Sequence, residues 1–358
     1  MDMMFEAYLT HESGHLEPDD IPKNAQGPVW ILGVEYCHRG EYKSIFMCIT
    51  LLWFSYRRGF VSIGNSGLTS DKGWGCMLRC GQMVIAQALL FLHLGREWCW
   101  SPNKRDRDYL RILHMFEDVH SAPYSIHQIA ISGLDEGKQV GEWFGPNTIA
   151  QVLKKLSVND EWSSIAFHVA LDNALVINDV RRLCVNSGRR TNRGDRKSST
   201  RWKPLILIIP LRLGIAEIIL SMYKTCFTFR QSLGVIGGKP NHAYISLVAK
   251  RCDISRPAHN STCGFVQSKE QEHEKKVDCT YHCKHASRLP ILHMDPSVAV
   301  VRRKDFDNLC QEIRMKLIIP EKQHLFELFD EKPQSWAPPD GSAEEALRAV
   351  GGYFPRCV

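Results

Sequence analysis

The sequence changes character at residue 76, where a glycine-flanked turn is followed by an apolar segment. The turn, DKGWG, occupies residues 71–75, and Cys76 comes directly after it. Beyond Cys76, apolar residues that include Met77, Val84 and Ala88 recur at the spacing of one helical face. The pattern therefore predicts a helix that begins at Cys76 and anchors the turn against a core.

A cysteine at the first turn of a helix can have either of two roles. The unpaired backbone N–H groups and the positive end of the helix dipole stabilise a thiolate, so the pKa of Cys76 should fall. A thiolate of this kind is a nucleophile. The alternative is a buried structural cysteine, which is the commoner fate of this residue type. The local pattern alone does not decide between the two.

The cysteine content bears on the cellular compartment. The chain has 13 cysteines in 358 residues, and its first twenty residues are mixed and acidic, unlike a basic and apolar leader. We therefore expect a cytoplasmic protein with reduced thiols and no disulfide framework. We expect no membrane span either, because the longest apolar run, residues 204–211, has the length of a strand.

The net charge of +6 does not indicate a nucleic-acid surface. Much of the positive excess lies in residues 188–203, where serine, threonine, asparagine and glycine separate the basic side chains. This segment has no apolar period, so we interpret it as a solvated loop.

The order of the predicted elements favours an α+β chain with one elaborated domain. Residues 145–156 form an amphipathic helix with a proline in its first turn. Short apolar runs at residues 165–171, 204–210 and 232–238 predict buried strands. Helices thus come first and strands afterwards, without a regular βαβ alternation.

The domain limits follow from the weakly organised segments. We predict an N-terminal tail, one domain with two loop inserts, and a C-terminal tail, at residues 1–27, 28–332 (inserts 188–203 and 264–288) and 333–358.

Six motifs in order make the chain resemble the autophagins, the cysteine endopeptidases that process the ubiquitin-like modifier of autophagy. The motifs are PVWILG (28–33), WFSYRRGF (53–60), GWGCMLRCGQM (73–83), GEWFGPNTIAQVLKKL (141–156), RWKPLILIIPLRLG (201–214) and QSLGVIGGKPNHA (231–243). The resemblance covers most of the chain from residue 28 to about residue 317.

The resemblance implies a papain-like fold with the nucleophile on a central helix. Cys76 takes the nucleophile's position, and Tyr56 matches a tyrosine that helps to form the oxyanion hole. Trp143 matches a tryptophan that covers the substrate groove. From the residues alone, Tyr56 could equally be an aromatic at the edge of the core, and Trp143 could be core packing.

The same resemblance implies a substrate and a lid over the groove. A mobile loop that includes Gly237, Gly238 and Pro240 would lie over the groove. The substrate would be the modifier's C-terminal tail, cut after a glycine in the precursor or in the form conjugated to phosphatidylethanolamine. Contact with autophagic membranes would then be peripheral and through the substrate. No cofactor and no nucleic acid is implied.

The chain departs from the family where the catalytic base should be. Relatives carry Leu-Asp-Pro-His-Thr-Thr-Gln shortly after the glycine-rich segment, and the residues that follow Ala243 here contain no such sequence. Asp295 does not replace the missing aspartate, because its surroundings match a second segment that relatives carry downstream. His259 is the nearest histidine and the candidate base, but a lone loop histidine is usually solvent-exposed and needs an orienting partner.

Residues 255–261 can be traced to the missing motif through their possible codons. They can be written tct cga ccc gca cac aac tca, and removing the first base gives Leu-Asp-Pro-His-Thr-Thr and the start of Gln. We therefore hypothesise a one-base frame error that enters after about Ala243 and is compensated near Gly264.

Two further patterns point only weakly to a function. A group of cysteines and histidines suggests a zinc site, but no second cysteine pair lies at the spacing found in zinc fingers, so we expect no metal site. Its members are Cys263, His273, Cys279, His282, Cys283 and His285. Residues 326–329, FELF, resemble a peptide that binds autophagy modifiers, and we expect them to pack in the core instead.

Two functions remain open at this point. The first is an endopeptidase of the autophagy modifier with Cys76 as nucleophile. The second is a catalytically impaired relative that binds the modifier without cutting it, because the Asp-Pro-His segment is missing from the chain as written.

Overall fold

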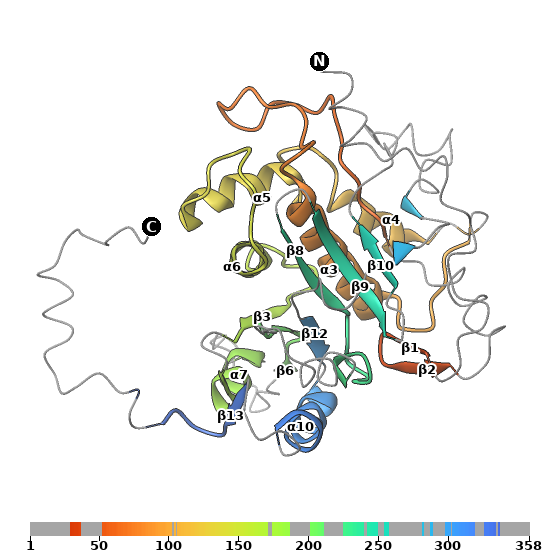
Figure 1. Cartoon of the computed structure of the whole chain (residues 1–358), viewed down its shortest axis with the longest axis vertical. Helices are drawn as coiled ribbons and strands as arrows, with labels where there is room; N and C mark the ends of the chain where they lie inside the picture. Colours follow the sequence, from red (N-terminus) through yellow and green to blue (C-terminus); the bar gives the residue numbers. More distant parts are fainter. Residues whose placement is uncertain are drawn as a thin grey trace, which may run out of the picture.

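The computed structural model combines helices and strands around one central helix, α3 (Figure 1). It describes residues 29–36, 52–101, 104, 106–170, 174–186, 201–210, 225–239, 242–249, 254–257, 281–282, 287–288, 298–301, 303–318, 326–333 and 336. The helical elements are α3 (Cys76–His93), α4 (Arg107–His114), α5 (Ile126–Ser132), η1 (Gly133–Glu136), α6 (Pro146–Ser157), α7 (Ile177–Cys184), α10 (Arg303–Ile313) and η4 (Arg314–Ile318).

The strands are β1 (Val29–Ile31), β2 (Val34–Tyr36), β3 (Ala166–Val169), β4 (Ala174–Val176), β5 (Val185–Asn186), β6 (Arg201–Trp202), β7 (Leu205–Ile208), β8 (Val235–Lys239), β9 (His242–Ala249), β10 (Ile254–Pro257), β11 (Ser287–Arg288), β12 (Val298–Val301) and β13 (Glu327–Phe329). They confirm the strands expected at residues 165–171, 204–210 and 232–238. The hairpin of β1 and β2 was not expected, because helices were predicted to dominate the first half.

Helix α3 begins at Cys76, as the glycine turn predicts, but it is not amphipathic. Every residue from Cys76 to Leu90 is buried, so the expectation of one apolar face was wrong. Elements pack around the whole circumference of α3, and burial all round is what a central helix requires.

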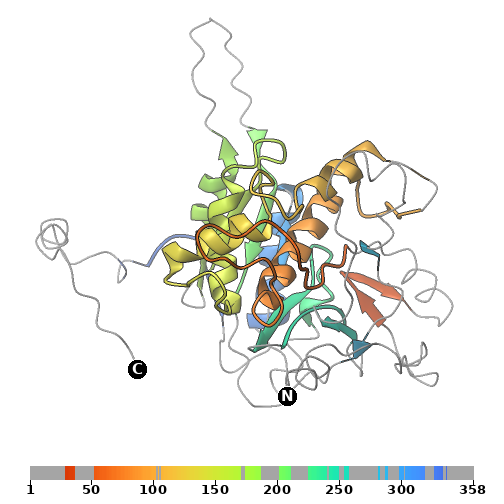
Figure 2. The ribbon, with the colours of Figure 1, turned by 90° about the horizontal axis from the view of Figure 1, so that it is seen from above.

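We expected no membrane span because the longest apolar run, residues 204–211, has the length of a strand, but that reason overlooked α3. Among the described helices, α3 is long and apolar enough by length and composition. However, 83% of this 18-residue helix is buried inside the protein, as in the core helix of a globular domain. Figure 2 shows α5 and α6 on one side of α3 and the hairpin of β1 and β2 on the other.

The sheet beside α3 is organised around β9. Its strand order is β11-β10-β9-β1-β2, and β8 also pairs with β9. Tyr244, Ile245 and Ser246 of β9 pair with both β8 and β10, so these two strands flank β9 on opposite edges. Helix α3 packs against β8 and β9, which places the start of the helix beside the sheet (Figure 1).

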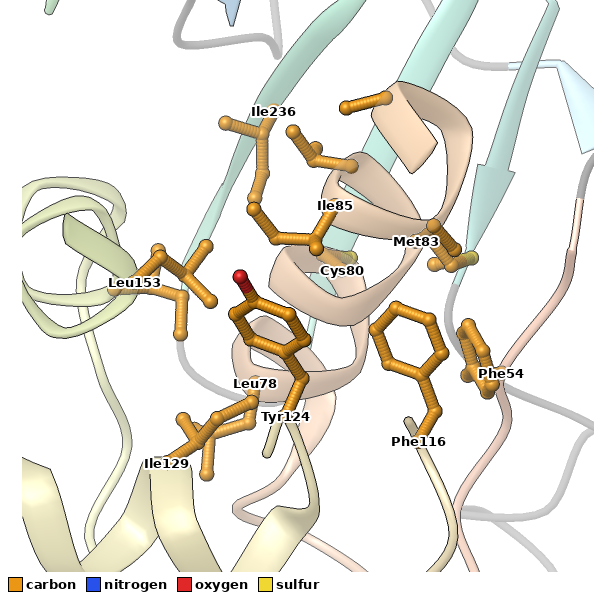
Figure 3. Close-up of a cluster of buried hydrophobic side chains, with 14 of the residues drawn as sticks. Phe54, Leu78, Cys80, Met83, Ile85, Phe116, Tyr124, Ile129, Leu153 and Ile236 are labelled. Carbon is orange, nitrogen blue, oxygen red and sulfur yellow. The ribbon is translucent and has the colours of Figure 1, made fainter. Parts of the chain in front are cut away.

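Aromatic rings close the core on the side of α3 away from the sheet. Figure 3 shows Phe54, Phe116 and Tyr124 lying against the helix, and their ring centroids are 5.1 Å apart for Phe54 and Phe116 and 5.8 Å for Phe116 and Tyr124. Leu153 of α6 and Ile236 of β8 complete the enclosure. Burial of this many large side chains fixes α3 from several directions.

A second core lies around the three-stranded sheet β12-β7-β3. Helices α7 and α10 contribute Val180 and Phe306 to it, and both side chains are buried. Phe326 is also buried there, at 2% exposure, and β13 pairs in parallel with β4. The expectation that residues 326–329 pack in the core is therefore confirmed for Phe326.

Candidate active site

The first turn of α3 presents the Cys76 sulfur to backbone donors from two elements. Gly75 is the N-cap and supplies no side-chain capping bond, so the amide groups of the first turn are open at this end. The N–H of Met77 donates to the sulfur, and so does the N–H of Ala243 on β9. The sheet therefore contributes directly to the environment of the thiol.

Two side chains that the sequence singled out also lie near this sulfur. Tyr56 and Trp143 each lower the pKa of Cys76. Trp143 is half-buried and lies just before α6, and Tyr56 lies in the irregular segment of residues 53–57. The structure thus brings Cys76, Tyr56 and Trp143 together from three separate parts of the chain.

Burial nevertheless raises the pKa of Cys76 above the ordinary value of a thiol. The Cys76 side chain is fully buried, and the loss of hydration disfavours the thiolate more than the neighbouring polar groups favour it. The expectation that the helix N-terminus would lower this pKa was therefore wrong. Burial also raises the pKa of Tyr56, so its hydroxyl stays protonated and remains a donor.

The resemblance implies a mobile loop that includes Gly237 and Gly238, but both residues lie in a strand, as the apolar run at residues 232–238 predicts. Gly237 and Gly238 lie in β8, where Gly238 pairs with Ala243 of β9. Gly238 has a φ of 150°, a conformation that favours glycine. Only two residues, Pro240 and one more, separate β8 from β9, and Pro240 lies outside the described residues.

No histidine is among the groups that shift the pKa of Cys76. Besides burial, these groups are the backbone N–H groups of Met77 and Ala243 and the side chains of Tyr56 and Trp143. Two described histidine side chains have partners elsewhere: His93 stacks on Trp162, and His127 bonds to the Val61 carbonyl. The candidate base, His259, lies outside the described residues.

Of the six cysteines and histidines considered as zinc ligands, all but His282 lie outside the described residues. His282 is the exception, and its Nε2 is 2.7 Å from the Tyr109 hydroxyl. Its ring stacks on Trp100 with centroids 4.1 Å apart. In the part of the chain that the structure describes, no three histidine, cysteine or acidic residues gather as they would around a metal ion.

Sequence reasoning missed a buried group of four charges beneath the site. Arg79 donates from Nε to Asp71 Oδ2 at 2.7 Å and from Nη1 to Asp118 Oδ1 at 2.9 Å. Arg57 donates from Nη1 to Asp118 Oδ2 at 2.9 Å. All four side chains are at most 4% exposed. We call Arg57, Asp71, Arg79 and Asp118 the buried quartet.

The buried quartet is electrically balanced and fully enclosed. Burial opposes ionisation of Asp118, but Arg57 and Arg79 outweigh that effect and hold the pKa of Asp118 below its ordinary value. A sequence signal did exist, because Arg79 lies inside an apolar helix where a charge requires a partner.

Comparisons with known proteins identify the family to which the chain belongs. A model of the peptidase C54 catalytic domain matches residues 44–312. Cysteine protease ATG4B of Xenopus laevis is 42% identical over 362 aligned residues, covering 93% of this chain and 91% of the relative. Cysteine protease ATG4A of Gallus gallus is 44% identical over 338 residues, covering 87% and 88%. Cysteine protease ATG4A of Homo sapiens is 42% identical over 352 residues, covering 91% and 88%.

Proposed function

Because the chain belongs to the peptidase C54 family of cysteine proteases, the autophagins, we propose that Cys76 is its nucleophile toward the ubiquitin-like modifier of autophagy. The family assignment confirms the resemblance that the six motifs indicated. The modifier's precursor and its phosphatidylethanolamine-conjugated form are the two substrates, each cut after a glycine. The enzyme class is a cysteine-type endopeptidase.

The observation that carries this proposal is the set of donors around the Cys76 sulfur. A thiolate that attacks a carbonyl carbon forms an S–C bond and leaves negative charge on the carbonyl oxygen. The Tyr56 hydroxyl and the Trp143 N–H, which already face the sulfur, are suited to donate to that oxygen. The C–N bond then breaks, the amine leaves with a proton, and water hydrolyses the thioester.

A thin substrate tail suits the elements that surround the sulfur. Trp143 would cover one side of the scissile bond, and β8 with Gly237 and Gly238 would form another wall. Pro240, next along the chain, would extend that wall. Because Gly237 and Gly238 carry no side chains, the groove beside them would accept a narrow tail that ends in glycine.

The reaction needs a base, and the register of β10 supports the frame-error hypothesis for its loss. Pro257 pairs with Tyr244, so the pairing, continued by one residue, would put position 258 opposite Ala243. Ala243 is the residue whose N–H donates to Cys76. The shifted reading puts histidine at position 258 and aspartate at position 256, and residues two apart on a strand share a face.

A second function is favoured by the described surroundings of Cys76. The contacts of the sulfur supply hydrogen-bond donors but no group that could take its proton, and its raised pKa keeps it protonated near neutral pH. The chain as written would then bind the modifier without cutting it. Thiol attack and amine departure both require proton transfer, so an absent base impairs both steps.

A cleavage assay with a fluorescent modifier precursor separates the two functions. The full chain, the Cys76→Ala variant and a control with the exposed Cys99 changed to alanine are compared for cleavage, and binding of uncut precursor is measured alongside. Cleavage that Cys76→Ala abolishes and Cys99→Ala preserves supports the endopeptidase. Binding without cleavage in all three supports the impaired relative. Absence of both binding and cleavage contradicts the proposed substrate.

We also propose the surroundings in which this reaction takes place. The protein would act in the cytoplasm without a cofactor, and it would meet autophagic membranes only through the lipid-conjugated substrate. The protease domain would span residues 28–332, somewhat beyond the family match at residues 44–312. The tails at residues 1–27 and 333–358 would lie outside the domain.

A further inference from the structure

His127 is a buried histidine that the proposed reaction does not use. It is the second residue of α5, and its side chain is fully buried. Its Nε2 lies 2.6 Å from the carbonyl oxygen of Val61. A carbonyl oxygen can only accept a hydrogen bond, so Nε2 carries the proton of this bond.

The other ring nitrogen of His127 is unsatisfied. Nδ1 is buried and has no hydrogen-bond partner among the residues that the structure describes. Burial lowers the pKa of His127, so the ring is neutral near pH 7 and Nδ1 offers a lone pair. A buried nitrogen without a partner costs stability, which a ligand at Nδ1 would recover.

A second histidine, His120, lies beside the His127 ring. The centroids of the two imidazoles are 4.4 Å apart, and their planes are inclined by 58°. His120 is exposed, so its ring can turn about its side-chain bonds. Two imidazole nitrogens that bind one zinc ion at about 2.1 Å lie about 3.4 Å apart. Rings at this spacing can reach that separation when the His120 ring turns.

The backbone holds the two histidines in place relative to each other. The N–H of Tyr124 donates to the Met115 carbonyl at 3.0 Å and closes the loop that carries His120. Gln128 Nε2 donates to the His120 carbonyl at 2.6 Å, which ties that loop to α5. One ion could therefore bind both rings with little movement of the main chain.

We propose that His120 and His127 form a binding site for a divalent transition-metal ion, with Nδ1 of His127 and one nitrogen of the His120 ring as its protein ligands. Imidazole is a common ligand of zinc, copper and nickel ions. A metal-bound histidine typically donates its other N–H to a carbonyl or carboxylate, and the bond to Val61 is of this kind. No third histidine, cysteine or acidic residue of the described chain joins the pair, so water would complete the coordination.

The site is separate from the candidate nucleophile. Neither histidine is among the groups that shift the pKa of Cys76. Instead, Phe60 lies edge-on to the His127 ring with centroids 5.4 Å apart, and Val61 accepts from it. An ion bound here would join α5 to the loop of His120 beside this segment, and it would stabilise the fold rather than take part in cleavage.

The test is protection of His120 by Zn²⁺ against diethyl pyrocarbonate in the full chain, followed by mass spectrometry. The reagent acylates an imidazole nitrogen that has a free lone pair. A ring bound to zinc through one nitrogen and protonated on the other has none. At ten times its dissociation constant, Zn²⁺ should therefore slow the modification of His120 about tenfold. Because one residue is read out, zinc bound by cysteines elsewhere does not contribute.

His127→Gln removes Nδ1 and keeps the bond to Val61, because the glutamine amide supplies an N–H donor. We expect the zinc concentration for half protection of His120 to rise more than about tenfold in this variant. His114→Ala is the matched control, because His114 precedes the same loop and its Nδ1 contacts the Glu117 carboxylate. It should change the half-protection concentration by less than about twofold.

His120→Ala covers the possibility that His127→Gln does not fold, because an exposed side chain is replaced. Zn²⁺ should raise the melting temperature of the full chain and of His114→Ala more than that of His120→Ala. Absence of protection, equal protection in His127→Gln, or equal shifts in His120→Ala would overturn the proposal. Loss of protection in His114→Ala would also overturn it. Neither readout depends on cleavage of the modifier.

Discussion

The two sides of the candidate active site are built to different degrees. On the helical side, packed aromatic rings and the buried quartet fix the surroundings of Cys76. On the strand side, β10 pairs with β9 in a register that leads toward Ala243, yet the residues written there include neither the aspartate nor the histidine of the family motif. The described part of β10 ends at Pro257, one residue before the position that the shifted reading gives to the base.

This difference teaches which part of a catalytic site depends on individual residues. The position of a strand follows from backbone hydrogen bonds, so it survives the replacement of several side chains. A base and its partner depend on two particular side chains, and a short frame error removes both. The nucleophile's environment, in contrast, draws on residues spread over most of the first half of the chain.

The largest effect should come from rewriting β10 in the shifted frame. The changes are Ser255→Leu, Arg256→Asp, Ala258→His, His259→Thr, Asn260→Thr and Ser261→Gln. We expect cleavage of the modifier precursor to increase on the order of 10⁴-fold, the typical value of a base and its partner in such sites. Single-turnover cleavage of the fluorescent precursor measures this increase.

Two controls make the result of that rewriting specific. Cys76→Ala in the rewritten chain should abolish the gain. The rewritten chain with glutamine instead of histidine at position 258 should gain less than about tenfold. Equal cleavage by the original and rewritten chains would show that the strand side was complete as written.

The next effect concerns the stability of the helical side. Arg79→Met leaves Asp71 and Asp118 buried with one arginine between them, so we expect a loss of about 3–5 kcal/mol in the free energy of unfolding. Urea denaturation followed by circular dichroism measures the loss. The exposed pair of Arg181 and Asp307 offers a matched control, and Arg181→Met should cost less than about 1 kcal/mol. Similar losses in both variants would contradict the importance given to burial.

A third prediction uses His168, on β3 in the second core. Burial lowers the pKa of His168 to about 4, so the folded protein holds it neutral. Its contribution to stability is complete above the ordinary histidine pKa of about 6.5 and is lost as the pH falls from there to about 4. We expect His168→Asn to reduce the loss of unfolding free energy between pH 7.5 and 4.5 by up to about 3 kcal/mol. An unchanged pH dependence would show that His168 titrates normally in the folded state.

The smallest effect should come from a helix cap on the helical side. The Asp106 side chain accepts from the N–H groups of Asp108 and Tyr109 at 3.0 and 3.4 Å, and so caps α4. Asp106→Ala should cost about 1 kcal/mol of unfolding free energy. Asp106→Asn keeps the accepting oxygen and should cost less than half as much. Thermal melts of the two variants measure this difference. Equal losses of stability in Asp106→Ala and Asp106→Asn would show that the cap is unimportant.

The sequence predicted the start of α3, the proline-led helix α6 and the strands β3, β7 and β8, because each rests on a local pattern. Prediction failed where a property depends on contacts with residues that are distant in the sequence. The pKa of Cys76 depends on complete burial by distant segments, which no local pattern contains. The family resemblance implied a loop at the glycine pair, but these two glycines pair with β9 as part of β8.

The family motifs identified residues of the candidate site that local sequence patterns could not identify. They associated Tyr56 and Trp143 with Cys76 although 20 and 67 residues separate them in the numbering, and the structure brings both to the sulfur. They gave no indication of the buried quartet, because its hydrogen bonds join residues far apart in the sequence.

The pH profile of Cys76 alkylation in the chain as written tests the central claim most directly, namely that the nucleophile is in place and its base is absent. We predict a single rise in rate with a midpoint above the pKa of an ordinary cysteine, and a midpoint well below it in the chain rewritten at β10, where an imidazolium would stabilise the thiolate. A chain as written that already reacts at its full rate at pH 6 would contradict the account.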